Sequence, residues 1–395
     1  MKILIVSFYD DNFGDMLIRT CFENILKCAL ESLGVSQNDC VIEKMNQKHI
    51  EEEKILSSDL VVFAGGALFG FNYQNFLEGI EKIVTLSKSR EIPIVFSSLG
   101  VNNVASCEGE VGVLKKLLCF DNIKGLSVRE NPSLFEEYLE GNSLKAVSVC
   151  DPAVWAGKIF SLKKSGSKTV GINVVRGGLF KANGLEWKLK DEEEYLFNLK
   201  NLLDEKGIDY KFFTNGSVLD CNTLNHFAEK YEIPEDKLIF PDSSKQLVEA
   251  VSSFGAVASI RLHSAIVSYS LCVPSVNLNW NENVPYFYEN IGYSDRLVSI
   301  DENAAENMAS KLSEALENDY SLSEEYLMSL YYYLLEKLKE VFSLEIKEEY
   351  GFNELCKRVG EIGVREEDYI TDLTTKIKRG SFVLNSCRNE GFENK

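Results

Sequence analysis

Histidine is scarce in this chain, whose 395 residues include only His49, His226 and His263. The 10 cysteines are scattered and contain no Cys-x-x-Cys pair. Structural metal sites are usually built from closely spaced cysteine and histidine ligands, so we expect no metal site. Dispersed thiols without a disulfide framework are typical of reduced intracellular cysteines that act as small core residues. We therefore expect a cytoplasmic protein.

Positive charge is also in deficit, since 42 Lys and Arg residues stand against 61 Asp and Glu residues, a net charge of −19. Non-specific nucleic-acid binding needs a basic face that displaces counterions, so we expect no nucleic-acid partner. A small anionic substrate is still compatible with this balance, because a few arginines can set the local field.

Long hydrophobic runs are missing as well. The longest uncharged apolar run covers only residues 60–71, which is too short to span a bilayer. The first residues, MKILIVSFYDDN, lack the small-residue cleavage site of a signal peptide and predict a buried strand. Any membrane contact is therefore expected to be peripheral.

Short apolar runs alternate with stretches of helical periodicity, which predicts α/β structure with mostly parallel sheets. We expect a first set of strands at 2–7, 59–64, 93–98, 125–128 and 146–150, with helices at 16–33, 76–88, 111–118 and 132–139. We expect a second set of strands at 169–175, 210–214, 237–240, 255–259 and 275–278, with helices at 192–206, 222–230, 244–252, 262–271 and 304–316.

Residues 163–168 (KKSGSK) form a polar break between these two sets and are the best candidate for a linker. The chain is accordingly divided into 1–160, 168–320 and 321–395. The first two segments are expected to be Rossmann-like domains that face a cleft. The third segment is a helical extension and polar tail, whose helix at 323–342 is expected to pack back across the first domain. No role is assigned to residues 343–395.

Candidate ligand-binding residues of the first domain follow its strands, where ligands bind in such sheets. Asn12, Gly14 and Asp15 precede a helix, and a glycine there lets backbone amides approach a ligand. The structural alternative is that Asp15 caps the helix and Gly14 makes the turn. Gly65 and Gly66 follow another strand, where close packing is an equally good explanation. No Gly-x-Gly-x-x-Gly dinucleotide motif follows the first strand.

The most informative segment of the second domain is Arg261-Leu262-His263, at a strand end and a helix N-terminus where anions are favoured. An arginine suits phosphate or carboxylate, and a histidine can exchange a proton near neutral pH. His263 is the best catalytic candidate of the three histidines. A packing role is the alternative for His263, and packing or exposure is the default for His226.

Other polar residues also follow strands and can join the site. They are Arg176, Asn215 and Gly216 in the second domain, and Arg129 and Asp151 in the first. Arg129 is as well explained by pairing with Glu130 or Glu136, Asn215-Gly216 by a turn, and Asp151-Pro152 by a turn start.

Taken in order, these motifs resemble the polysaccharide pyruvyl transferase family. The matching pieces are Asn12-Phe13-Gly14-Asp15, the Gly-rich turn at 64–69, Ser127-Val128-Arg129-Glu130, Asp151-Pro152-Ala153, Arg261-Leu262-His263 and Val273-Pro274-Ser275-Val276. The resemblance implies a GT-B-like fold and transfer of pyruvate from phosphoenolpyruvate to a sugar as a ketal, without a cofactor. It also implies that the acceptor binds to the first domain and the donor to the second, where Arg261 contacts it. His263 is implied to be essential, and the sugar acceptor to be carried by a lipid at the inner membrane face.

The sequence departs from this family in two places. The Gly-rich turn has Ala67 where members often have a third glycine, and Trp280 is not followed by the lysine that many members have. The sequence therefore offers no donor-binding lysine directly after Trp280.

Two other functions stay open at this point. One is a GT-B-type glycosyltransferase that uses a nucleotide-sugar, with Glu282 or Glu289 holding the ribose, because a fold alone does not separate these activities. The other is a non-catalytic sugar- or phosphate-binding protein. The acceptor, the ketal stereochemistry and the oligomeric state are not indicated by the sequence.

Overall fold

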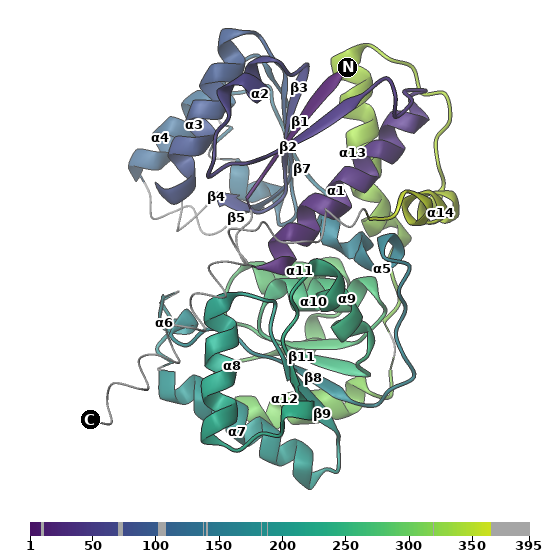
Figure 1. Cartoon of the computed structure of the whole chain (residues 1–395). Helices are drawn as coiled ribbons and strands as arrows, with labels where there is room; N and C mark the ends of the chain where they lie inside the picture. The colour runs from purple at the N-terminus through teal and green to yellow at the C-terminus, as the bar shows by residue number, and fades with distance from the viewer. Residues whose placement is uncertain are drawn as a thin grey trace, which may run out of the picture.

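The computed structural model describes residues 1–8, 12–69, 74–101, 108–136, 138–139, 141–182, 184–187, 189–318 and 320–364. Two α/β domains follow one another along the chain, each built on its own parallel sheet (Figure 1). The α-helices are α1 (Phe13–Ser32), α2 (Glu52–Leu56), α3 (Gln74–Ser89), α4 (Glu108–Leu118), α5 (Ala156–Ile159), α6 (Leu179–Ala182), α7 (Leu189–Glu205), α8 (Val218–Lys230), α9 (Ser244–Ser252), α10 (Leu262–Ser270), α11 (Asn283–Asn290), α12 (Ala304–Ala315), α13 (Glu324–Phe342) and α14 (Phe352–Ile362).

The first sheet has the strand order β2-β1-β3-β5-β6-β7, with β4 paired to β5. Its strands are β1 (Lys2–Ser7), β2 (Val41–Asn46), β3 (Leu60–Ala64), β4 (Ala67–Phe69), β5 (Ile94–Val101), β6 (Ile123–Val128) and β7 (Ala146–Ser148). Alternate residues of β1 face opposite sides: Ile3 and Ile5 pack with α1, whereas Leu4 and Val6 pack with α3. Because both faces are covered, the central strands are continuous apolar runs.

The second sheet has the strand order β10-β9-β8-β11-β12-β13. Its strands are β8 (Val170–Asn173), β9 (Tyr210–Phe213), β10 (Leu238–Ile239), β11 (Ala256–Ser259), β12 (Ser275–Leu278) and β13 (Leu297–Val298). Helices α7, α8 and α12 cover one face, and α9 and α10 cover the other. The strand order reverses between β8 and β11, and in the first sheet it reverses between β1 and β3. Such reversals are where ligands bind in open α/β sheets.

The chain returns to the first domain after the second sheet. Helix α13 runs beside α1 and contacts β5 and β6, as expected for this segment (Figure 1). The Tyr331 hydroxyl lies 2.8 Å from Ser32 Oγ, and the Tyr333 hydroxyl donates to the Phe96 carbonyl at 2.9 Å. Helix α14 then packs on α1 and α5. In space, the first domain therefore includes helices from both ends of the described chain.

Two sequence predictions differ from the structure. The helix expected at 132–139 is a single 3₁₀ turn, Pro132–Phe135, which Asn131 caps by accepting from Ser133 N. Within the segment expected to be a polar tail, α14 buries Leu355 and Val359. The end of the apolar run at 60–71, two of the 10 cysteines (Cys107 and Cys387) and residues 365–395 lie outside the described residues. Among the described helices, none combines the length and the hydropathy of a membrane-spanning segment.

Candidate active site between the domains

The N-terminus of α1 in the first domain meets the N-terminus of α10 in the second. Phe13 N donates to the Asn215 carbonyl at 2.9 Å, which joins the two domains through their backbones. A Cβ atom on Gly14 would lie only 2.4 Å from the Cβ of His263. Gly14 is therefore required by this close approach of two helices, because any side chain would separate them.

His263 lies between two carboxylates of the opposite domain. Its Nδ1 is 3.5 Å from Asp15 Oδ1, and its Nε2 is 3.8 Å from Asp151 Oδ2. The residue is only 8% exposed, and its buried Nε2 makes no hydrogen bond with a described residue. A buried polar atom without a partner is costly, so this nitrogen is available for a ligand.

Asp151 is fixed by a buried ion cluster at the carboxyl ends of β6 and β7. Arg129 Nη1 donates to Asp151 Oδ2 at 2.6 Å, and Arg129 Nε donates to Glu130 Oε1 at 3.0 Å. Ala153 N donates to the other oxygen of Asp151. The structural alternative holds for each residue, because Arg129 pairs with Glu130 and Asp151 begins a 3₁₀ turn. The same cluster also holds the Asp151 carboxylate toward His263.

The charges in this cluster shift the acid strength of its members. Burial raises the pKa of Asp151, but His263 and Arg129 outweigh it and hold the pKa well below its usual range. Burial lowers the pKa of Arg129, but Glu130 and Asp151 outweigh it, so this guanidinium stays charged. Asp15 behaves differently, since burial raises its pKa and the nearby His263, Arg261 and Arg129 only partly offset that effect. The histidine therefore faces one firmly ionised carboxylate and one that protonates more readily.

Arg261 is held by Asp220 from the first turn of α8. Its Nε and Nη2 atoms donate to the two Asp220 oxygens at 3.0 and 2.7 Å, and its backbone N donates to Asn173 Oδ1 at 2.9 Å. The same carboxylate accepts from the backbone N of Arg176 at 2.7 Å. Asp220 is completely buried, so it fixes both arginine segments at the carboxyl ends of β8 and β11.

A row of buried polar side chains follows the carboxyl edge of the second sheet. Asn173 ends β8, Asn215 follows β9, and Ser259 and Asn277 stand side by side near the ends of β11 and β12. Asn173 Nδ2 donates to Asn215 Oδ1 at 3.1 Å. The Nδ2 of Asn215 and both amide atoms of Asn277 lack a hydrogen-bond partner among the described residues. These amides can therefore bind oxygen atoms of a ligand.

The remaining candidates stabilise local structure. Asn12 caps α1, since its side chain accepts from Gly14 N, so the capping role considered for Asp15 belongs to Asn12. Gly65 and Gly66 have φ angles of 61° and 86°, and a Cβ on Gly65 would lie 2.4 Å from Ile18 of α1. Their described neighbours are α1, the sheet and Pro152. Gly216 makes a turn at φ 90°, and Leu262 is the first residue of α10.

Trp280, the residue that lacks a following lysine, has a structural partner. Its indole nitrogen donates to the Ile260 carbonyl at 2.7 Å, directly before Arg261. Among the described ranges of the chain, no group of three or more His, Cys, Asp and Glu side chains is arranged to hold a metal ion.

Sequence reasoning missed Asp220, Asn173 and Asn277. Asp220 is an acidic residue in the first turn of a helix, which is a common position that carries no specific signal. The two asparagines lie inside strands that were expected to be apolar. A polar residue near the carboxyl end of such a strand is the pattern that would have indicated them as site residues.

Comparison with known proteins supports the family suggested by these residues. The family model described as polysaccharide pyruvyl transferase matches residues 12–282, which is more than half of the chain. No individual curated protein matches the chain.

Solved structures support the fold. The UDP-GlcNAc 2-epimerase of Methanocaldococcus jannaschii, in complex with UDP-GlcNAc and UDP, is 12% identical, with a TM-score of 0.52 over 87% of this chain and 99% of that one. A putative UDP-N-acetylglucosamine 2-epimerase from Listeria monocytogenes is 10% identical, with a TM-score of 0.54 over 89% of this chain and 99% of that one. At such identities the likeness shows the fold alone, which is the GT-B-like pair of Rossmann-like domains.

Proposed function

Because the chain belongs to the polysaccharide pyruvyl transferase family, we propose that it transfers pyruvate from phosphoenolpyruvate to a sugar as a ketal and releases phosphate. The observation that carries this proposal is the placement of His263. This imidazole from the second domain lies between Asp15 and Asp151 of the first, two residues from Arg261.

The reaction requires a proton donor and anion-binding groups in one cleft. A proton is added to the methylene carbon of phosphoenolpyruvate, which leaves a cationic centre at the adjacent carbon. One sugar hydroxyl attacks that carbon, phosphate departs, and a second hydroxyl closes the ketal. The two sugar hydroxyls together release two protons. One replaces the proton that was added to the methylene carbon, and the other leaves with the phosphate as hydrogen phosphate.

In this proposal His263 gives the proton to the methylene carbon or takes one from the attacking hydroxyl. The ionised Asp151 carboxylate stabilises the imidazolium form, and Arg129 keeps Asp151 ionised and in place. The Asp15 carboxylate, 3.5 Å from the other ring nitrogen of His263, is proposed to stabilise the positive charge that develops on the substrate.

The donor's negative charges are assigned to the second domain. Arg261, fixed by Asp220, binds the phosphate or the carboxylate of phosphoenolpyruvate, and Arg176 supplies a second guanidinium from the end of β8. The unpartnered Nδ2 atoms of Asn215 and Asn277 donate to the donor's oxygen atoms. We propose no metal or organic cofactor, and we place the reaction in the cytoplasm, with the acceptor on a lipid at the inner membrane face.

The direct test is phosphate release from phosphoenolpyruvate in the presence of lipid-linked saccharides from the source cells. We expect release that depends on the acceptor, together with a product whose mass is the acceptor plus pyruvate less one water. Mass analysis of lipid-linked intermediates from cells with and without the protein would show the same shift. Consumption of a nucleotide-sugar with no phosphate release would refute the proposal in favour of a glycosyltransferase.

A further inference from the structure

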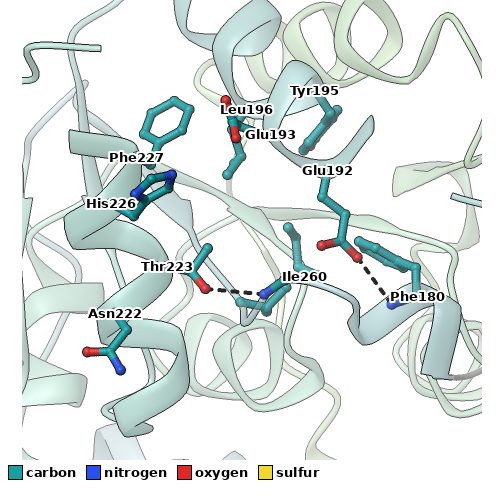
Figure 2. Close-up of a pocket in the computed structure, with 12 residues that line it drawn as sticks. Phe180, Glu192, Glu193, Tyr195, Leu196, Asn222, Thr223, His226, Phe227 and Ile260 are labelled. Carbon is teal, nitrogen blue, oxygen red and sulfur yellow. Dashed lines mark hydrogen bonds between the residues drawn. The ribbon is translucent and has the colours of Figure 1, made fainter. Parts of the chain in front are cut away.

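A cavity of about 360 Å³ lies in the second domain between α7 and α8, outside the site described above (Figure 2). This volume is within the range of pockets that hold small ligands. Its apolar lining consists of Val175, Phe180, Tyr195, Leu196, Phe227 and Ile260. The aromatic rings among these residues provide flat apolar walls for a ring-shaped ligand.

The cavity adjoins the donor arginines. Val175 and Ile260 of its lining directly precede Arg176 and Arg261 in the chain. Helix α8 connects the two sites, because Asp220 in its first turn holds Arg261, and Asn222 and His226 farther along line the cavity. At a rise of 1.5 Å per residue, Asp220 and His226 are separated by roughly 9 Å along the helix axis. A ligand in the cavity is therefore close to the proposed reaction centre.

Some polar groups of the cavity are already used by the backbone around it. The Glu192 carboxylate accepts from Gly178 N at 2.8 Å and from Phe180 N at 3.3 Å. The Thr223 hydroxyl accepts from Gly177 N at 3.2 Å. These hydrogen bonds, of which Figure 2 shows two, hold the loop after β8 as one wall. The wall is thus preformed without a ligand.

Two other polar side chains of the lining have no such partner. Asn222 and His226 are four residues apart on α8 and both line the cavity, with Asn222 half-buried and His226 exposed. No side-chain hydrogen bond joins either of them to another described residue. An amide and an imidazole can each donate and accept, which suits a ligand that carries hydroxyl groups.

The charge of the lining restricts the ligand further. The described residues that line the cavity include Glu192 and Glu193 but no lysine or arginine. Glu193 pairs with Lys230, and Glu192 accepts from two backbone amides, so the lining keeps no free cation for a phosphate or carboxylate. The ligand that fits is a neutral ring with apolar faces and hydroxyl edges, which is the chemistry of a saccharide.

We propose that this cavity is a saccharide subsite, which binds a neutral sugar residue of the acceptor next to the residue that receives pyruvate. The inference rests on the proposed function, because it takes the acceptor to be a saccharide longer than one residue. It assigns His226 and Asn222 as the groups that recognise the sugar's hydroxyls. It also extends acceptor binding from the first domain to the second.

The test uses the full chain and nuclear magnetic resonance binding measurements with methyl glycosides of glucose, galactose, mannose and N-acetylglucosamine, with uridine as the competing ring-shaped ligand. We expect at least one glycoside to bind. His226→Ala and Asn222→Ala should each weaken its binding about 5- to 10-fold, the loss expected for one hydrogen bond. His226→Gln should restore part of the loss, and Asn225→Ala, on an exposed part of the same helix, should change nothing.

A second measurement on the same samples tests the proposed function independently of the subsite. It detects binding of phosphoenolpyruvate through the ligand's phosphorus resonance. If glycosides bind and the two alanine variants weaken them while phosphoenolpyruvate does not bind, the subsite stands and the proposed donor fails. Failure of every glycoside to bind, with or without binding of uridine, would overturn the subsite. Glycoside binding that the folded alanine variants leave unchanged would overturn it too.

Discussion

At the scale of residues, the candidate site is organised around the His263 imidazole, which contacts both domains. His263 belongs to the second domain, but both carboxylates that face its nitrogen atoms belong to the first. Its surroundings are therefore complete only when the domains are in contact. The same dependence applies to Asp15, whose pKa is raised by a burial that the second domain helps to provide.

Replacement of His263 by alanine tests its catalytic role. We expect turnover, measured as acceptor-dependent phosphate release, to fall roughly 10²- to 10⁴-fold, the usual contribution of a general acid or base. The KM for phosphoenolpyruvate should change little, because the arginines remain. His49→Ala, at an exposed position, is the matched control and should keep full turnover. A folded His263→Ala protein with turnover near that of the wild type would contradict the assignment.

The pair formed by Arg261 and Asp220 gives a second prediction. Asp220→Asn keeps the shape of the side chain but loses the bidentate ion pair, so the guanidinium is no longer fixed. We expect the KM for phosphoenolpyruvate to rise about tenfold or more, and Arg261→Lys to do the same because lysine lacks the fork. Asp204→Asn, which removes an exposed pair with Lys200, is the control. An unchanged KM in both site variants would exclude Arg261 from donor binding.

The depressed pKa of Asp151 predicts how stability depends on pH. In the folded protein the pKa of this carboxyl lies below its unfolded value of about 3.9. The ionised group therefore contributes its full share to the free energy of unfolding above about pH 3.9, and that share is lost as the pH falls toward the folded pKa. Asp151→Asn should lower the free energy of unfolding by roughly 3 kcal/mol at pH 7, as expected for one partner of a buried pair. The difference from wild type should shrink as the pH falls below about 4.

Urea unfolding at a series of pH values between 3 and 7 measures this difference. Asp236→Asn, at an exposed position, corrects for carboxyl groups elsewhere in the chain. A difference between wild type and Asp151→Asn that stays constant from pH 6 to pH 3 would show that Asp151 does not titrate as proposed.

Of the candidate site residues, only those that lie next to one another in the chain could be recognised as a group from the sequence. Arg261 and His263 could be recognised because they share one strand end and one helix start. Their partners could not, since Asp220 lies 41 residues before Arg261 and Asp15 lies in the other domain. No local pattern encodes such a contact, because only the folded sheets bring these residues together.

At the scale of secondary structure, the site depends on two helix N-termini that meet end to end. Gly14 permits this contact between α1 and α10, and the Phe13–Asn215 hydrogen bond holds it. A helix N-terminus favours negative charge, so the meeting of two of them favours an anion at this point, as the proposed donor requires.

Gly14→Ala tests this contact. Alanine is a good helix former, so α1 should remain intact, but the added methyl group would collide with His263 and push the domains apart. We expect a loss of turnover of about 100-fold and a larger radius of gyration in X-ray scattering, with little change in circular dichroism. Gly112→Ala in α4, where a Cβ would meet open space, should behave like wild type. If Gly14→Ala keeps its activity, the close packing of these helices is not needed.

Elements with continuous or periodic apolar residues could be predicted, and weakly patterned elements could not. Strands β1, β3 and β5 match their predicted positions because both of their faces are buried. Strand β2 was missed, since it lies at the sheet edge and only Met45 of its six residues is buried. The segment after Asn131 has apolar residues at helical spacing, but it packs as a single 3₁₀ turn.

At the scale of the whole molecule, the chain returns to the first domain through α13 after it has formed the second sheet. This return gives a prediction. A chain that ends at Ser321 would expose the face of α1 that packs against Leu327, Tyr331 and Leu334. Each such side chain contributes roughly 1.5–3 kcal/mol through its burial, which is large against a total stability of about 5–15 kcal/mol. We expect this shorter chain to aggregate or lose its cooperative thermal transition. A shorter chain that keeps the cooperative transition of the full chain would contradict this role of α13.

The salt bridge between Lys168 and Glu317, 2.6 Å long, contributes little stability because both side chains are exposed, but it marks where the chain enters and leaves the second domain. The two crossings lie side by side, so the second domain is an insertion into a surface connection of the first. Insertions whose ends meet are tolerated because the host fold closes around them. Because its entry and exit are adjacent, the inserted half can be exchanged or diversified without disturbing the sheet and the returning helices of the host half.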